Sequence, residues 1–264
     1  MPAFKQHLLL KERLSERVTK DYVLTVQRLL AQCQGNVTPQ AVANYLAGYL
    51  NKTPKTYNNQ LDGLRALLGR YCGREDLVAG YKRAYVPASS SEELSDKQVR
   101  AGFYGLTSDE ERGLYLLLAT AGLRKREALD LRRSDVTPEL RCIRAEHDTR
   151  TKKAGVTFYN PECERYLALI LANAEADARL FRLSDSAFRK LWDKASARAG
   201  TRITAQQLRI WHSSKLGELM VPDRYVGIFQ GRAPRSVLAK HYTGKALLRL
   251  KHIYDHAELK VLDG

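Results

Sequence analysis

The chain has 264 residues, with 44 Lys and Arg against 29 Asp and Glu, which gives a formal net charge of +15. This balance indicates an anionic polymer as partner, and nucleic acid is the usual one. A hydrophobic content of 44% and a charged content of 28% exclude a disordered basic tail. The length fits one large domain or two smaller ones.

The cysteines offer no metal site. Cys33, Cys72, Cys142 and Cys163 lie far apart, without CxxC or CxxH spacing, and we interpret them as reduced thiols. The N-terminal apolar run is too short for a signal peptide, and no stretch approaches the roughly 18 apolar residues of a membrane span. These features predict a soluble, intracellular protein.

Residues 1–86 have the periodicity of helices. Apolar positions recur every three or four residues in DYVLTVQRLLAQ and again in LDGLRALLGRY. This region has 13 Lys and Arg against 6 Asp and Glu, so it is basic, as is the remainder of the chain. The following segment PASSSEEL, residues 87–94, has the proline and serine content of a linker, which places a domain boundary there.

The remaining residues, 95–264, are predicted to be mostly helical. The run RGLYLLLATAGL predicts a buried helix that ends near Gly122. Between residues 141 and 160, two short strand-like stretches flank a basic centre, which predicts a β-hairpin or the edge of a small sheet. Three pairs have the spacing of a helix capping box: Ser95 with Gln98, Ser108 with Glu111, and Thr204 with Gln207.

Four basic or nucleophilic segments follow one another in this region. They are GLRKRE at 122–127, TRTKKAG at 149–155, QQLR at 206–209 and GRAPRSVLAKHY at 231–242. Any one arginine among them is most simply a phosphate contact. Their order, however, resembles that of the tyrosine recombinase (phage integrase) family. The run QGRAPRSVLAKHY is similar to one in integrases of spindle-shaped archaeal viruses and related archaeal plasmids.

The resemblance assigns roles to individual residues. Tyr242 matches the nucleophile, and Arg124 and Arg209 match the two arginines that bind the nonbridging phosphate oxygens. Glu127 matches the acidic residue that helps to hold the site together. Lys152 is our choice for the hairpin lysine that protonates the leaving oxygen, with Lys153 as the alternative, since the register of a hairpin is uncertain by one residue.

This sequence departs from the family pattern at two positions. Gln206 falls where the histidine of the HxxR motif usually stands; it can donate a hydrogen bond to phosphate but is no strong acid. The histidine of the LGH motif should lie nine residues before the nucleophile, where this chain has Ala233. Arg232, ten residues before Tyr242, matches the archaeal viral pattern instead and is a third candidate phosphate ligand. With glutamine in place of that histidine, the sequence does not identify the general base that would deprotonate Tyr242.

Two other histidines lie near the candidate residues in sequence. His241 is adjacent to Tyr242, but neighbouring residues on a helix point about 100° apart, so we interpret it as structural or DNA-facing. His212 follows Arg209 by three residues and could approach the site. We favour a satisfied structural histidine beside Trp211.

The tail after Tyr242 has helical spacing. In the family such a tail packs onto a neighbouring protomer, and the alternative is packing on its own domain. Its apolar positions are Leu247, Leu250, Tyr254 and Ala257. The resemblance also predicts DNA contacts from basic residues around the site, namely Arg126, Arg150, Lys153, Arg235 and Lys240.

The sequence therefore predicts a mainly α protein with a helical core-binding domain over 1–86, a linker over 87–94, and a tyrosine recombinase catalytic domain with a small antiparallel β element over 95–264. The resemblance implies a site-specific integrase that cleaves and rejoins DNA through a 3′-phosphotyrosyl intermediate. It would act as a homo-tetramer on double-stranded attachment sites, with accessory DNA-bending factors as further candidate partners and without a metal, cofactor or membrane.

The implied location is the cytoplasm of an archaeal host, on DNA, with a provirus as the product of integration. We find no arm-binding domain ahead of residue 1, so we expect a simple reaction or a truncated chain. Two alternatives stay open: a catalytically silent DNA-binding protein of this fold, favoured by Gln206 and the missing LGH histidine, and a type IB topoisomerase.

Overall fold

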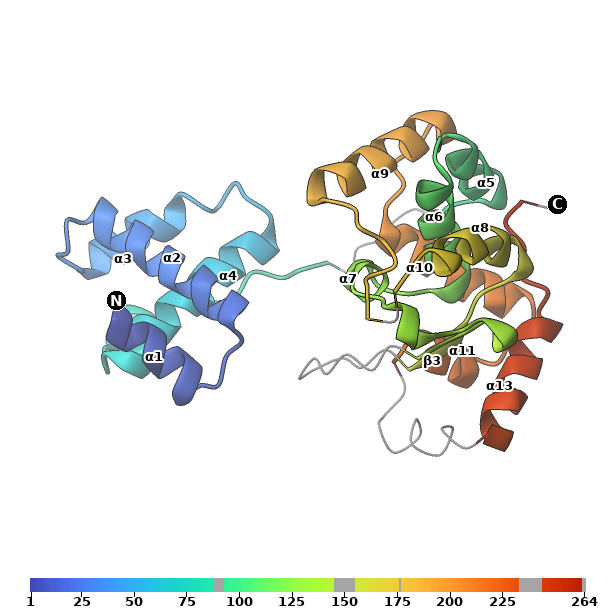
Figure 1. Ribbon diagram of the computed structural model, residues 1–264. Helices are drawn as coiled ribbons and strands as arrows, with labels where there is room; N and C mark the ends of the chain where they lie inside the picture. Colours follow the sequence, from blue (N-terminus) through green and yellow to red (C-terminus); the bar gives the residue numbers. More distant parts are fainter. Residues whose placement is uncertain (88–92, 145–154, 176, 233–243, 263–264) are drawn as a thin grey trace. The chain divides into compact units, whose positions relative to one another are not determined.

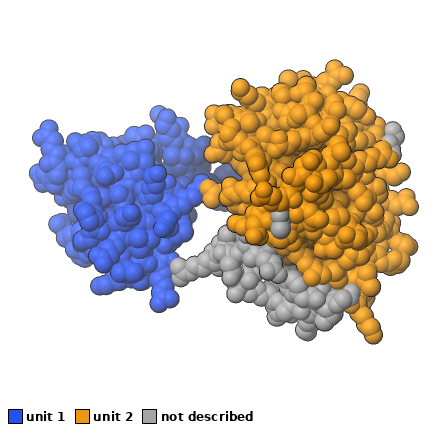
Figure 2. Space-filling model, viewed as in Figure 1, with its two compact units in different colours: residues 1–90 blue, residues 91–264 orange. Residues whose placement is uncertain are grey.

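The computed structural model describes residues 1–87, 93–144, 155–175, 177–232 and 244–262. The chain divides into two compact units, Met1–Ser90 and Ser91–Gly264 (Figure 2). The division falls inside the segment 87–94. Each unit buries a hydrophobic cluster of its own. Across the described ranges, no helix is long and apolar enough to cross a membrane.

The described part of the first unit is helical (Figure 1). Ser15, Thr38 and Thr53 are N-caps whose side chains accept hydrogen bonds from the backbone of the first turn, where amides would otherwise lack partners. The predicted helices are therefore present, and their apolar faces form one core. The elements are α1 (Pro2–Leu10), α2 (Glu16–Gln32), α3 (Pro39–Ala47), α4 (Pro54–Leu64), the π-helix η1 (Arg65–Tyr71) and the 3₁₀-helix η2 (Glu75–Leu77).

The second unit is mainly helical as well, which confirms the predicted fold class. Its α-helices are α5 (Asp96–Tyr104), α6 (Asp109–Ala121), α7 (Lys125–Leu129), α8 (Pro161–Ala172), α9 (Asp185–Ala199), α10 (Ala205–Glu218), α11 (Asp223–Phe229) and α13 (Gly244–His256). The 3₁₀-helix η3 (Arg133–Asp135) lies between α7 and the sheet, and a second 3₁₀-helix, η4 (Pro138–Leu140), connects the first two strands of the sheet. In α6, all residues from Gly113 to Ala121 are buried, so this helix lies at the centre of the unit.

The predicted capping pairs fix where three helices begin. Ser95 with Gln98 and Ser108 with Glu111 form complete capping boxes at α5 and α6. At α10 the box is incomplete. The Thr204 hydroxyl accepts from the backbone amide of Gln207 at 3.2 Å, as in a capping box. The Gln207 side chain, however, accepts from the same hydroxyl at 3.1 Å, whereas in a complete box it would accept from the backbone amide of Thr204.

A small antiparallel sheet interrupts the helices, as predicted for residues 141–160. Its order is β1-β2-β3, with β2 (Cys142–Arg144) between β1 (Val136–Thr137) and β3 (Val156–Phe158). Ile143 lies opposite Val136 on one side and Thr157 on the other. The sequence analysis missed β1, because two residues are too few to show an alternating pattern.

The C-terminal helix α13 packs on its own unit. Leu250 is 0% exposed and Tyr254 2% exposed, both in the same hydrophobic cluster as α6. The Tyr254 ring lies 5.6 Å from the rings of Phe158 in β3 and Phe229 in α11. Of the two alternatives left open for the tail, the structure shows packing on its own unit, whose core the apolar side chains of the described tail complete.

Hydrogen bonds hold the end of this tail in place. The buried Glu162 carboxylate accepts from the amides of Val261 at 2.8 Å and Leu262 at 2.9 Å. The Asn160 side chain donates to the Leu259 carbonyl at 2.9 Å. A carboxylate that accepts from two backbone amides binds a chain segment firmly, so residues 259–262 are attached to the start of α8.

Candidate active site

The C-terminus of α6 leads directly into the first candidate arginine. Gly122 ends the helix with a φ of 62°, a left-handed conformation that glycine adopts without steric cost. Arg124, two residues later, is the N-cap of α7. The Glu127 carboxylate accepts from the Arg124 amide at 2.8 Å and from its Nη1 at 2.5 Å. This pairing holds both the backbone and the guanidinium of Arg124.

Side chains from three other elements bind the last carbonyls of α6. The Tyr254 hydroxyl donates to the Thr120 carbonyl at 2.7 Å, and the Thr157 hydroxyl donates to the Ala121 carbonyl at 2.8 Å. Arg209 donates to the Gly122 carbonyl. These carbonyls have no partner within the helix, so α13, β3 and α10 each satisfy one of them. The position of Arg124 is thereby tied to all three elements.

Arg209 is buried in α10, with 2% of its surface exposed. Its Nη1 donates to the Gly122 carbonyl and its Nη2 to the Gln230 carbonyl. Nη1 also lies 3.9 Å from Glu127 Oε2, so one carboxylate contacts both arginines. Burial, and then the charge of Arg124, lower the pKa of Arg209 to about 10, which leaves it protonated at neutral pH.

A turn after α11 supports Arg209 from a second direction. Gln230, 1% exposed, donates through Nε2 to the Arg209 carbonyl at 2.8 Å and lies 3.0 Å from Nδ1 of His212. Because Gln230 Nε2 is a donor, Nδ1 accepts and the proton of the neutral ring is assigned to Nε2. The interpretation of His212 as a structural histidine agrees with this buried contact.

The pKa of His212 is lowered to about 3, first by burial and then by the charge of Arg209. A second cation, Arg232, lowers this pKa further, and the Thr120 carbonyl raises it. The imidazole is therefore neutral at neutral pH. It serves as an acceptor in the support of Arg209 and carries no charge.

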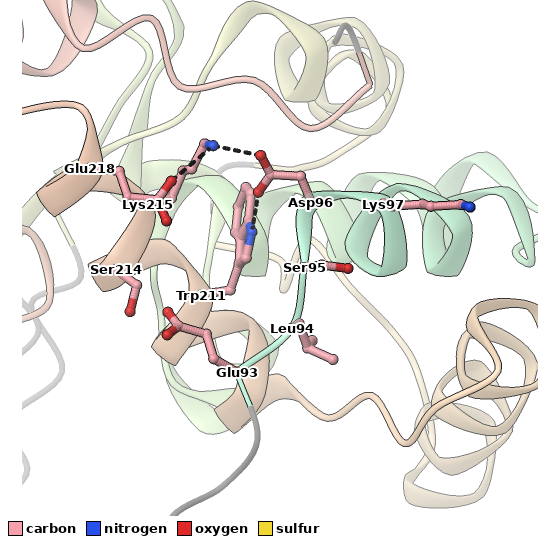
Figure 3. A pocket seen from close by; sticks show the side chains of 9 residues that line it. All are labelled: Glu93, Leu94, Ser95, Asp96, Lys97, Trp211, Ser214, Lys215 and Glu218. Atoms are coloured by element: carbon pink, nitrogen blue, oxygen red, sulfur yellow. Dashed lines mark hydrogen bonds and ion pairs between the residues drawn. The ribbon is translucent and has the colours of Figure 1, made fainter.

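Asp96 holds α10 on the side of the helix that faces away from Arg209. Trp211 Nε1 donates to Asp96 Oδ1 at 2.9 Å, and Lys215 Nζ lies 2.5 Å from Oδ2 (Figure 3). Burial would raise the pKa of Asp96, but the hydrogen bonds from Lys215 and Trp211 outweigh it and lower that pKa. Because Trp211 lies two positions from Arg209, the two side chains leave α10 about 200° apart. The contacts of Asp96 therefore do not involve the face of α10 that carries Arg209.

The remaining candidates are distributed as follows. Gln206 is exposed in the first turn of α10, one turn before Arg209, and Arg126 is exposed on α7. Arg232 is exposed at the end of the described segment, with its amide bonded to the Gly227 carbonyl at 2.7 Å. The other predicted residues lie outside the described ranges: Arg150, Lys152 and Lys153 within 145–154, and Arg235, Lys240 and Tyr242 within 233–243.

Sequence reasoning missed Gln230 as a site residue, although it lies in the run that showed the resemblance. A glutamine at the end of a short helix has no distinguishing pattern in sequence. Its role depends on α10 packing beside α11, which places its amide against Arg209 and His212.

The described site is suited to binding an anion. Two guanidinium groups converge on one carboxylate, and Arg209 stays charged while mostly desolvated. In Arg209, the two Nη contacts use one N–H each, which leaves further N–H groups for a ligand. Paired guanidinium groups of this kind match the geometry of phosphate oxygens.

Comparisons with known proteins identify the relatives of this chain. A family model described as archaeal phage integrase matches residues 92–257. A comparison with curated protein sequences found no match.

Solved structures show the same fold over most of the chain. The integrase from mycobacterium phage Brujita has a TM-score of 0.51 at 19% identity, with 99% of this chain and 95% of that chain covered. The Tn1549 transposon integrase in complex with circular intermediate DNA has a TM-score of 0.68 at 12% identity, with 93% and 96% covered. A lambda integrase dimer bound to a COC' core site has a TM-score of 0.68 at 12% identity, with 93% and 77% covered.

At these identities the structural likeness shows the fold, while the family model spans more than half of the sequence. The chain therefore belongs to the archaeal phage integrase family and has the fold of a tyrosine recombinase.

Proposed function

We propose that this protein is a site-specific recombinase that cuts and rejoins DNA strands through a covalent link to Tyr242. Family and fold support site-specific recombination in general. The observation that carries the proposal is the shared carboxylate of Glu127, which contacts Arg124 at 2.5 Å and Arg209 at 3.9 Å. Two fixed cations at one point are what a phosphodiester needs when charge grows on its nonbridging oxygens.

The reaction needs no external energy. The Tyr242 oxygen attacks the scissile phosphorus, the bond from phosphorus to the 5′-oxygen breaks, and a 3′-phosphotyrosyl link and a 5′-hydroxyl result. In rejoining, a 5′-hydroxyl of the partner strand attacks the link and releases the tyrosine. One phosphate ester replaces another at each step, so the bond energy is conserved.

The supporting residues have separate roles in this proposal. Arg124 and Arg209 hold the nonbridging oxygens, and the exposed Arg232 adds a third donor. Lys152, or Lys153 in the other register, protonates the leaving 5′-oxygen, because a lysine among cations has a lowered pKa and releases its proton more readily. Gln206 donates a hydrogen bond to a phosphate oxygen.

DNA is the proposed partner of both units. Two of the similar structures contain DNA, bound by the Tn1549 and lambda integrases, and this chain has a formal net charge of +15. We propose that residues 1–86 form a core-binding domain joined by the linker 87–94 to a catalytic domain over 95–264. Phosphate contacts would come from Arg126, Arg150, Lys153, Arg235 and Lys240, and exchange between two sites would require a tetramer.

A covalent trapping assay tests the proposal. The wild type, Tyr242→Phe and the control Tyr104→Phe, at an exposed tyrosine of the second unit, are incubated with nicked suicide duplexes. The duplex sequence is first selected by binding of the full chain to random DNA. We expect a covalent band on a denaturing gel from the wild type and from Tyr104→Phe, and none from Tyr242→Phe.

Other outcomes distinguish the rival functions. Binding without a covalent band from any variant would favour a silent DNA-binding protein, and a band that survives Tyr242→Phe would place the nucleophile elsewhere. A type IB topoisomerase would relax supercoiled plasmid without a selected sequence and as a monomer. The wild type should instead recombine two selected sites.

A further inference from the structure

Two histidines form a pair on the outer face of α13 (Figure 1). His252 and His256 are four residues apart, which places them on one side of the helix, in successive turns. Both side chains are exposed, and the centroids of their rings lie 4.0 Å apart. Neither imidazole hydrogen-bonds to a residue that the structure describes, so their nitrogen atoms are available to a ligand.

The helix that carries the pair is held firmly. Leu250 and Tyr254, on the other side of α13, are 0% and 2% exposed and pack in the core of the second unit. Beyond the helix, the Glu162 carboxylate binds the amides of Val261 and Leu262. The backbone under both imidazoles is therefore fixed before any ligand binds, which lowers the entropic cost of binding.

The immediate surroundings of the pair permit a bound cation. Lys251 binds the carboxylate of Asp255, which offsets its positive charge. Arg249 donates to the Tyr225 hydroxyl at 3.4 Å. One turn before His252, the neighbour on the same side of the helix is the uncharged Leu248, which is 57% exposed.

Two imidazoles at this spacing are suited to a transition-metal ion. Zinc binds histidine nitrogen at about 2.0–2.1 Å, so two nitrogen ligands of one tetrahedral ion lie about 3.3 Å apart. Rings whose centroids lie 4.0 Å apart can present nitrogen atoms at that separation. Histidines at positions i and i+4 on one helix face are the arrangement that helical zinc sites use. Magnesium and calcium prefer oxygen ligands and do not fit the pair.

We propose that His252 and His256 chelate one divalent transition-metal ion, of the class of Zn²⁺, Ni²⁺ and Cu²⁺, on the exposed face of α13. Among the residues that the structure describes, no group of three or more His, Cys, Asp or Glu could hold a metal, so water completes the coordination. The ion connects two turns of α13 and stabilises the folded helix, since the unfolded chain does not hold the two rings together. It has no part in the cleavage of DNA, and the inference does not depend on the proposed function.

Calorimetric titration of the full chain with Ni²⁺ tests the site. All proteins carry Cys72→Ser, because this exposed thiol could bind the same ion. The parent is compared with His252→Gln and with His256→Gln, each of which keeps one imidazole. A matched variant combines His256→Gln with Leu248→His, which rebuilds a pair of the same spacing one turn earlier on an exposed face.

We expect each single variant to bind Ni²⁺ about tenfold or more weakly than the parent, because the second imidazole acts at a high effective concentration. The combined variant should recover most of the lost affinity. Cu²⁺ should bind the parent more tightly than Ni²⁺, and Mg²⁺ should not compete. Ni²⁺ should also raise the melting temperature of the parent more than that of either single variant.

Three results would overturn the proposal. The first is a parent that binds no Ni²⁺, and the second is equal affinity in the parent and both single variants, which would assign binding to other groups. The third is a loss in the single variants that the combined variant does not recover, which would contradict chelation at helical spacing. All three substituted positions of α13 are exposed, and circular dichroism shows that each variant is folded.

Discussion

Arg209 and Gln230 bind each other in both directions. The Arg209 guanidinium donates to the Gln230 carbonyl, and the Gln230 side chain donates to the Arg209 carbonyl at 2.8 Å. The Gln230 amide also lies 3.0 Å from His212 Nδ1. One buried glutamine therefore binds Arg209, a candidate catalytic residue, both at the backbone and at the guanidinium of that arginine.

Replacement of Gln230 by leucine should impair both stability and cleavage. The Arg209 carbonyl and His212 Nδ1 would each lose a donor in a buried setting, at a cost of about 1–3 kcal/mol. Urea unfolding measures that cost. Cleavage of the suicide duplex should slow more than DNA affinity falls, because the loosened guanidinium acts on the transition state. An equal loss of rate and affinity would make Gln230 a support for binding only.

Gly122→Ala should be more damaging than the same change at Gly200. Both glycines have a left-handed φ, 62° and 66°, at which alanine costs about 1–2 kcal/mol. At Gly200 an added Cβ meets nothing within 4 Å, whereas at Gly122 it would lie 2.6 Å from His212 Nδ1. We expect at least about 1 kcal/mol of additional destabilisation for Gly122→Ala. Equal melting temperatures of the two variants would contradict the close approach.

The buried histidine should make stability depend on pH. Burial and Arg209 lower the pKa of His212 to about 3, from an ordinary value of 6.5. Between these values the unfolded chain binds a proton that the native state does not, so the free energy of unfolding falls as pH falls, by up to about 1.4 kcal/mol per pH unit.

His212→Asn isolates this contribution, because its amide oxygen can accept from Gln230 without titrating. The wild type should lose more stability than His212→Asn between pH 6.5 and pH 4.5, while the carboxylates contribute equally to both. Parallel stability curves over that range would show that His212 is charged or exposed in the native state.

The packing of α13 on its own unit predicts a core that does not depend on assembly. Leu250 is 0% exposed and Leu248, on the same helix, is 57% exposed. Leu250→Ala should destabilise the second unit by about 2–5 kcal/mol and Leu248→Ala by less than about 1 kcal/mol. Both effects should be the same over a hundredfold range of protein concentration. A cost that grows with concentration would indicate packing between protomers.

Sequence alone determined the local features. Ser95 and Ser108 begin their helices because each side chain and its partner three residues later satisfy amides within one turn, and Gly122 ends α6 because it tolerates a positive φ. The order of Arg124, the basic segment 149–155, Arg209 and Tyr242 along the chain likewise indicated the family. These signals depend on neighbours in sequence or on a fixed order.

Only the tertiary structure decided which distant groups meet. The pairing of Arg209 with Gln230 joins residues 21 positions apart, and the bond from Tyr254 to Thr120 joins residues 134 apart. The same holds for the tail, whose spaced apolar residues fit a partner surface as well as their own core. Hydrophobic burial has no direction, so a pattern shows that a face is covered, and the packed fold shows what covers it.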